Sequence, residues 1–143
     1  MKKTDSLVRL LLTDIEDKDI LEVACGDASF SISASRYARS VSCIDLVDSR
    51  LKDIRQDNVH FEIMDAAKMR YASETFDTVF FYNALFHVRS QWEEIEKECR
   101  RVLKEMGSIY IVGTWKLDTA LMKDMFDDKA EWLNDFLIAR IEK

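Results

Sequence analysis

The sequence contains no proline and only three glycines, Gly26, Gly107 and Gly113, among its 143 residues. Glycine adopts a positive φ at little steric cost, so we expect each of the three at a constrained turn or strand end. Long apolar segments are also missing, because the longest apolar run covers only residues 78–88. This run is too short to cross a bilayer and is expected to be a buried strand and its exit.

The spacing of the cysteines and the scatter of the basic residues argue against several classes of protein. The three cysteines (Cys25, Cys43 and Cys99) form no C-x-x-C pair, which argues against a zinc site or a disulfide framework. The formal net charge is -6, and Lys and Arg form no stripe that could follow a phosphate backbone. Asp5 and Arg9 interrupt any signal-peptide pattern. We therefore expect a cytoplasmic protein without a metal site or membrane segment, and nucleic acid is disfavoured as its main partner.

The sequence alternates β-branched or apolar runs with helical stretches, over a length that fits one domain of residues 1–143. Strands are expected at residues 19–24, 41–45, 59–64, 76–83 and 108–114, and helices at residues 6–12, 29–39, 49–55, 90–104 and 117–142. This order predicts an α/β fold with a doubly wound, mostly parallel sheet of about five strands and helices on both faces. Ligands of such sheets bind at the carboxyl ends of the strands.

The segment from Asp19 to Ser29 is the most informative part of the chain. It reads as an apolar strand carrying Glu22, a turn of small residues around Gly26, and the start of a helix at Ser29. Such a turn allows a ligand to approach backbone amides at the start of the helix. We expect a carboxylate at Glu22 to repel a pyrophosphate and to favour a positively charged ligand. S-adenosylmethionine, which carries a sulfonium and an ammonium group, is such a ligand.

Polar side chains also end the next three expected strands. Asp45, 19 residues after Gly26, could accept hydrogen bonds from the ribose hydroxyls of a nucleoside, or it could cap a helix. Asp65 could accept a hydrogen bond from the exocyclic amine of adenine beside the amide of Ala66, or it could cap a turn. Asn83 could serve a ligand or the turn that follows. Each signal is weak alone, but the ordered set of four, beginning with Glu22, is specific.

With these residues in place, the chain resembles the class I S-adenosylmethionine-dependent methyltransferases, and in particular the group that contains the ubiquinone and menaquinone biosynthesis enzymes. The resemblance covers about residues 19–114 and rests on the segments LEVACG (21–26), VSCIDLVDSRL (41–51), MDA (64–66), FDTV (76–79), NALFHV (83–88) and RVLKEMG (101–107). It implies a Rossmann-like methyltransferase fold, S-adenosylmethionine as cofactor and a small-molecule methyl acceptor.

The resemblance also assigns roles to single positions. It places Glu22, Ala24, Cys25 and Gly26 around the methionine part of the cofactor, and Asn83 beside them. It places Asp45 on the ribose, Leu46 against the adenine, and Asp65 with Ala66 at the adenine edge. His87 would face the acceptor, either as a general base or as a packing residue at a helix start.

The sequence departs from the family pattern at two places. Alanines stand at positions 24 and 28, where the family turn has glycine, and only 29 residues follow Thr114. Because most of these residues read as helix, we expect the last antiparallel hairpin of the family to be absent. The fifth strand would then lie at an open edge, which a second copy of the chain or the C-terminal helix would cover.

Three functions remain open at this point. The first is methyl transfer to a small molecule, and the second is a non-catalytic S-adenosylmethionine-binding or partner subunit with a reduced cap over the acceptor. The third is a nicotinamide-dependent oxidoreductase, which the carboxylate of Glu22 and the missing G-x-G-x-x-G spacing disfavour.

Overall fold

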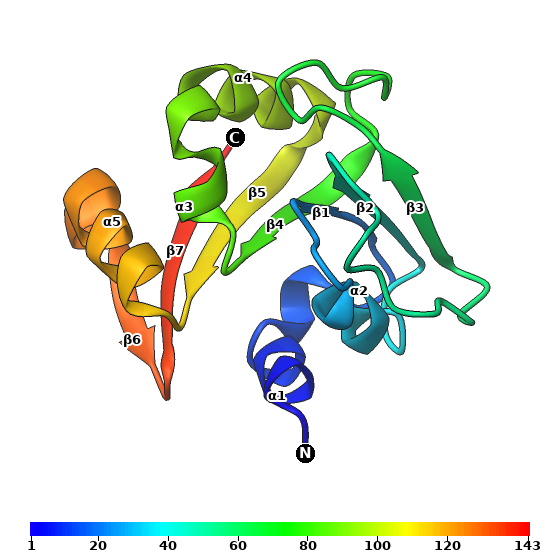
Figure 1. Cartoon of the computed structure of the whole chain (residues 1–143), viewed down its shortest axis with the longest axis horizontal. Helices are drawn as coiled ribbons and strands as arrows, with labels where there is room; N and C mark the ends of the chain where they lie inside the picture. The colour runs from blue at the N-terminus through cyan, green and yellow to red at the C-terminus, as the bar shows by residue number, and fades with distance from the viewer.

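Seven strands form one sheet in the order β3-β2-β1-β4-β5-β7-β6 (Figure 1). The structure is a computed structural model that describes residues 1–143. The strands are β1 (Asp19–Val23), β2 (Ser40–Asp45), β3 (Val59–Ile63), β4 (Phe76–Tyr82), β5 (Leu103–Gly113), β6 (Ala130–Leu133) and β7 (Phe136–Glu142). The first five strands are parallel, and β6 and β7 are antiparallel to their neighbours.

Helices cover both faces of this sheet. They are α1 (Lys3–Leu10), α2 (Ser29–Ala34), α3 (Leu85–Val88), α4 (Trp92–Val102) and α5 (Lys116–Phe126), with 3-10 turns η1 (Leu12–Asp14), η2 (Arg89–Gln91) and η3 (Asp127–Lys129). No helix combines the length and the apolar character that a membrane span requires. The α/β class, the parallel order and the two helical layers are therefore as predicted.

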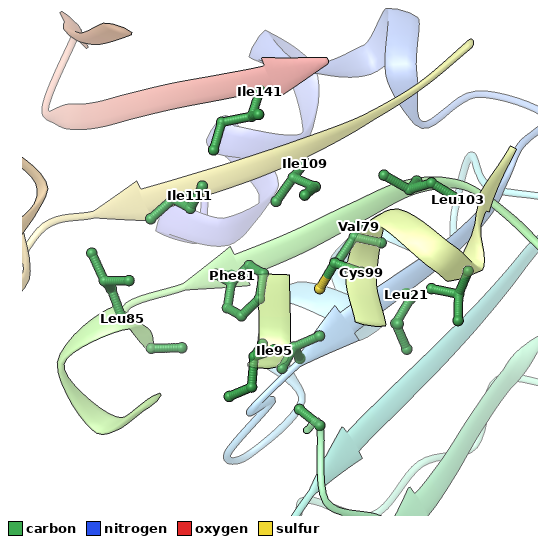
Figure 2. Packing of buried hydrophobic residues seen from close by; sticks show 14 of the residues in the cluster. Leu21, Val79, Phe81, Leu85, Ile95, Cys99, Leu103, Ile109, Ile111 and Ile141 are labelled. Carbon is green, nitrogen blue, oxygen red and sulfur yellow. The ribbon is translucent and has the colours of Figure 1, made fainter. Parts of the chain in front are cut away.

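Each face of the sheet has its own apolar core, because neighbouring residues of a strand point to opposite faces. On one face Leu21, Val79 and Phe81 pack against Ile95 and Cys99 of α4 (Figure 2). On the other face, buried residues of the same strands pack against α1 and α2; they include Ile20, Phe80, Leu7, Val8 and Phe30. Central strands that are buried on both faces explain the continuous apolar runs in the sequence.

The expected helix at residues 117–142 and the absence of the hairpin are wrong. Helix α5 ends at Phe126, and β6 and β7 then form an antiparallel hairpin in which Leu133 pairs with Phe136. The two-residue loop consists of Asn134 and Asp135, and Asn134 has φ 54°. Asn and Asp are favoured in such loops because they tolerate a positive φ. The sheet therefore has seven strands and not about five.

Strand β7 also corrects the expectation of an open edge at the fifth strand. It pairs with β5 from Ser108↔Glu142 to Gly113↔Leu137, so β5 lies inside the sheet. The edges are β3 and β6. The reason for a homodimer through the fifth strand is thereby removed.

Two smaller helical predictions also fail. The expected helix at residues 29–39 ends at Ala34, and residues 49–55 form no helix. The second segment instead bends back over the turn that follows β1. Its Lys52 backbone amide donates to the Asp27 carbonyl at 3.2 Å, and its ammonium group donates to Ser29 Oγ at 2.8 Å. These contacts bring Arg50 to the turn.

Candidate functional site

Two adjoining hollows lie at the carboxyl ends of the parallel strands, beside the point where the strand order reverses between β1 and β4. The larger is a cleft of about 520 Å³, with α1 and α2 on one side and α3 and α5 on the other (Figure 1). The smaller is a mainly apolar hollow of about 90 Å³ between β2, α3 and α4. Ala24 and His87 line both, so the two hollows form one continuous site.

The turn after β1 forms the floor of the cleft and is built from left-handed residues. Ala24, Gly26 and Ala28 have φ values of 56°, 57° and 66°. A side chain at Gly26 would be strained because of its positive φ, and a Cβ there would lie 2.8 Å from Arg50 Nη2, so the guanidinium would have to shift. The two alanines hold a conformation that costs an L-residue about 1–2 kcal/mol. The turn thus keeps the left-handed shape of the glycine turn with alanine at two of its three left-handed positions.

We expect Ala24→Gly to raise the free energy of unfolding by roughly 0.5–1 kcal/mol, because glycine relieves the left-handed strain at a half-buried position. The matched variant Ala28→Gly relieves the same strain but removes a fully buried methyl group, worth about 0.8 kcal/mol, so little net change is expected. Urea unfolding of both variants tests this difference. A loss of stability in Ala24→Gly would contradict the strain assigned to this turn.

Four backbone amides of the turn are already hydrogen-bonded within the protein. Cys25 donates to the Ile44 carbonyl at 3.0 Å, and Ala28 donates to the Cys25 carbonyl at 2.9 Å. Gly26 donates to Asp45 Oδ2 at 2.8 Å, and Ser29 donates to Asp27 Oδ1 at 2.9 Å. A pyrophosphate needs free amides at this place. The turn therefore forms a narrow floor for the cleft, and these four amides are not free to bind a phosphate.

Asp45 stands at the end of β2 and lines the smaller hollow. Its Oδ2 accepts the Gly26 amide, and its Oδ1 accepts the Leu46 amide at 2.7 Å. These bonds fix the carboxylate in one orientation, and each oxygen retains a further lone pair. Leu46 beside it is 64% exposed, which leaves an apolar surface next to an acceptor pair.

The smaller hollow places the other predicted nucleoside contacts together. Asp65 follows β3, and its Oδ1 accepts the Ala67 amide at 2.9 Å. Met64 and Ala66 are buried on either side of it and line the hollow with Ile44. A carboxylate at the rim of an apolar slot can accept a hydrogen bond from an amine on a flat ring that enters the slot.

Glu22 does not line either hollow. Its side chain is 1% exposed and lies beneath the turn, where Oε1 accepts hydrogen bonds from Ser31 Oγ at 2.7 Å and from the Ser31 amide at 3.2 Å. Burial raises the pKa of this carboxyl well above its ordinary value, against a smaller opposing effect of the bonds from Ser31. Glu22 thus fixes the first turn of α2. The hydrogen bonds that the backbone amides of the turn already make disfavour a pyrophosphate more directly than the charge of Glu22 does.

Asn83 lines the cleft, but its amide group is committed to the protein. It has φ 50°, its Oδ1 accepts the Thr114 amide at 2.8 Å, and its Nδ2 donates to Thr114 Oγ1 at 2.9 Å. These bonds tie the end of β4 to the end of β5. Cys25 also lines the cleft, as a buried free thiol whose pKa is raised, first through its hydrogen bond with Cys43.

His87 lies on the short helix α3, where its exposed side chain borders both hollows. The position of α3 is set from α5, because Asp118 Oδ1 accepts the Phe86 amide at 3.0 Å. Asp118 is 1% exposed, and its Oδ2 has no hydrogen-bond partner. Because its exposed side chain lines the cleft, His87 can face a ligand that occupies the end of the cleft near α3.

Sequence reasoning assigned no role to two cations of the cleft, Lys3 and Arg50. Lys3 begins α1, far along the chain from any strand end, so no local pattern could have identified it. Arg50 lies in the loop that was expected to be a helix. Trp115, which precedes α5, also lines the cleft and is 55% exposed.

Comparisons with known proteins agree with this geometry. A family model described as a methyltransferase domain matches residues 21–111. Phosphoethanolamine N-methyltransferase 1 of Caenorhabditis elegans is 28% identical over 116 residues, which cover 76% of this chain and 24% of that protein. The chain therefore spans about a quarter of the length of this curated relative.

Solved structures share the fold. A SAM-dependent methyltransferase from Aquifex aeolicus has a TM-score of 0.73 at 15% identity, over 96% of this chain and 89% of that one. Phosphoethanolamine N-methyltransferase 1 of Haemonchus contortus, in complex with phosphoethanolamine and S-adenosylhomocysteine, has a TM-score of 0.67 at 19% identity, over 80% of this chain and 26% of that one. Membership of this chain in the group that contains the ubiquinone and menaquinone biosynthesis enzymes stays a prediction. Because the family model covers more than half of the chain, this chain belongs to the methyltransferase domain family, and its fold is that of the class I S-adenosylmethionine-dependent methyltransferases.

Proposed function

We propose that this chain transfers a methyl group from S-adenosylmethionine to a small-molecule acceptor. The observation that carries this proposal is the pair of joined hollows at the carboxyl ends of β1, β2 and β4, with the carboxylate of Asp45 in the smaller hollow fixed by the amide of Gly26, which lines the larger one. The family match and the relative that holds S-adenosylhomocysteine support it. Residues 1–143 are proposed to act as one domain, since all seven strands share one sheet.

The residues present fit this cofactor. Asp45 would accept hydrogen bonds from the ribose hydroxyls, and Leu46 would cover one face of the adenine. Asp65 and Ala66 would meet the adenine edge inside the smaller hollow. Ala24, Cys25 and Gly26 would form the floor under the methionine part, and Arg50, which lies over Gly26, would pair with its carboxylate.

When bound, S-adenosylmethionine supplies a methyl group that the positive sulfur activates for transfer. The protein would hold the acceptor in line with this group and keep water away from it. Tyr82, Asn83 and His87 border the end of the cleft that remains for the acceptor. His87 is proposed to take a proton only from an acceptor that is still protonated, because an acceptor atom that is already nucleophilic needs no base.

The location is proposed to be the cytoplasm. Cys25, Cys43 and Cys99 are all buried and free, as is usual for proteins of a reducing compartment.

A binding experiment tests the choice of cofactor. We expect S-adenosylmethionine and S-adenosylhomocysteine to bind in calorimetry and NAD to bind at least about tenfold more weakly, because the amides of Cys25, Gly26, Ala28 and Ser29 in the turn are already hydrogen-bonded and cannot bind a pyrophosphate. NAD binding that equals or exceeds that of S-adenosylhomocysteine would overturn the proposal in favour of an oxidoreductase.

A second candidate is a non-catalytic S-adenosylmethionine-binding partner subunit. Exposed apolar side chains favour it, since Trp115, which lines the cleft, and the nearby Leu117 are 55% and 61% exposed. Turnover separates the two candidates. Formation of S-adenosylhomocysteine with any member of a panel of small acceptors, phosphoethanolamine included, supports the enzyme. Cofactor binding without turnover until a partner protein is added supports the subunit.

A further inference from the structure

The large cleft holds two cations that no carboxylate of the protein neutralises. Lys3 and Arg50 both line it, and neither takes part in an ion pair. The one carboxylate that lines the cleft, Asp27, lies 3.6 Å from Lys52 Nζ and is thereby balanced. The whole chain has a net charge of -6, so the positive charge of the cleft is a local excess. Unpaired cations in a cleft attract an anionic ligand.

The cofactor accounts for only one of these two cations. Arg50 lies over Gly26, where its Nη2 would be 2.8 Å from a Cβ at that residue. Under the proposed function this is the place of the methionine part, which carries a single carboxylate. Lys3 stands at the start of α1, with its Nζ 6.0 Å from the centre of the Phe136 ring of β7. The ammonium group of Lys3 is therefore available to pair with an anionic group of the acceptor.

Two aromatic side chains line the same cleft as Lys3. Trp115 is 55% exposed, so a large part of its indole ring is bare. Tyr82 lines the cleft at the end of β4, and its ring stacks with that of Phe30 at a centroid distance of 6.1 Å. A bare indole ring beside a cleft is suited to stack on a flat ligand.

We propose that the methyl acceptor is a flat, ring-containing molecule with an anionic group. Lys3 pairs with the anionic group, and Trp115 covers the ring. This inference rests on the proposed function, because the excess cation is counted after the cofactor carboxylate has been assigned to Arg50. It narrows the acceptor from small molecules in general to one chemical class.

Binding of two matched probes tests the inference without any turnover. The protein is first saturated with S-adenosylhomocysteine, whose carboxylate occupies Arg50, and is then titrated with 4-hydroxybenzoate or with the neutral 4-hydroxybenzamide. We expect the benzoate to bind at least about threefold more tightly, and this advantage to shrink as salt rises from 50 to 500 mM. The two probes share the ring and the hydroxyl and differ in charge.

Three variants assign the effect to residues. We expect Lys3→Gln to remove the preference for the benzoate, while Lys2→Gln, at the exposed neighbouring lysine outside the cleft, keeps it. Trp115→Ser should weaken both probes by a similar factor, because both present the same ring. Equal affinity of the two probes, an unchanged preference in Lys3→Gln, or unchanged affinities in Trp115→Ser would overturn the inference. Failure of S-adenosylhomocysteine to bind would instead overturn the proposed function.

Discussion

Replacement of Asp45 by alanine is expected to weaken the binding of S-adenosylhomocysteine by at least about tenfold. Asp45 is proposed to accept the hydrogen bonds of the ribose, and each hydrogen bond to a charged group is worth about 1.5–3 kcal/mol. The same carboxylate accepts the Gly26 and Leu46 amides at 2.8 and 2.7 Å, so its loss also loosens the turn under the cofactor. Isothermal titration calorimetry measures the effect directly.

Two further variants make this result specific to Asp45. Asp48→Ala removes an exposed carboxylate three residues further along the same loop and should leave the affinity unchanged. Asp45→Asn keeps one acceptor oxygen and should give an intermediate loss. If Asp45→Ala binds the nucleoside as well as the unmodified protein does, Asp45 is not part of the site.

The largest effect on stability is expected at Glu22. Glu22→Ala leaves the Ser31 amide and hydroxyl without their acceptor at a position that is 1% exposed, and it also opens a cavity between β1 and α2. Unpaired buried donors cost about 1–3 kcal/mol, and the cavity adds to this cost. We expect a loss of roughly 3 kcal/mol in the free energy of unfolding, measured by urea denaturation.

Glu22→Gln is the matched variant, because its amide oxygen can still accept from Ser31 while the side chain cannot ionise. Burial raises the pKa of Glu22 in the folded state, so the folded protein binds a proton that the unfolded chain releases. The stability that Glu22 provides is therefore complete below the ordinary pKa of about 4.3 and is lost as the pH rises through the folded-state pKa. At neutral pH Glu22→Gln should be more stable than the unmodified protein.

Unfolding of both proteins between pH 4 and pH 8 measures this linkage. The difference in unfolding free energy should grow with pH above about 4.3, by up to about 1.4 kcal/mol for each pH unit until the folded-state pKa is reached. Subtraction of the two curves removes the contribution of all other carboxyls, such as Asp19, whose pKa is lowered to about 2, mainly by its bond to Arg39. Parallel curves would show that Glu22 is ionised in the folded protein.

The strands from β1 to β5 could be predicted because each contains a short apolar run with a polar residue in it or close after it, although β5 begins at Leu103, five residues before its expected start. The same rule located Asp45 and Asp65, which the structure places at the rim of one continuous site. The burial of Glu22 can be predicted from the alternation of side chains along β1. This alternation puts Glu22 on the same face of the sheet as Ile20, toward α2. A charged side chain near a strand end was thus interpreted as a ligand contact although it faces the core.

The remaining errors have a common physical origin in contacts between distant segments. Residues 130–142 carry apolar side chains whose spacing suits a helix as well as a hairpin, and the pairing of β7 with β5 decides for the strand. Arg50 reaches the cleft because Lys52 is bonded to Asp27 and Ser29, which override the helical pattern of the loop. Lys3 reaches it through the packing of α1 on α2. None of these contacts is local in sequence.

The insertion of β7 between β5 and β6 has a consequence for synthesis of the protein on the ribosome. The five parallel strands emerge first, but the long strand β5 has a bare hydrogen-bonding edge until residues 136–142 have left the exit tunnel. A nascent chain that pauses before this point presents a template for pairing with other nascent chains. Closure of the sheet therefore waits for residues 136–142, after which β7 covers the edge of β5 and removes this template for aggregation.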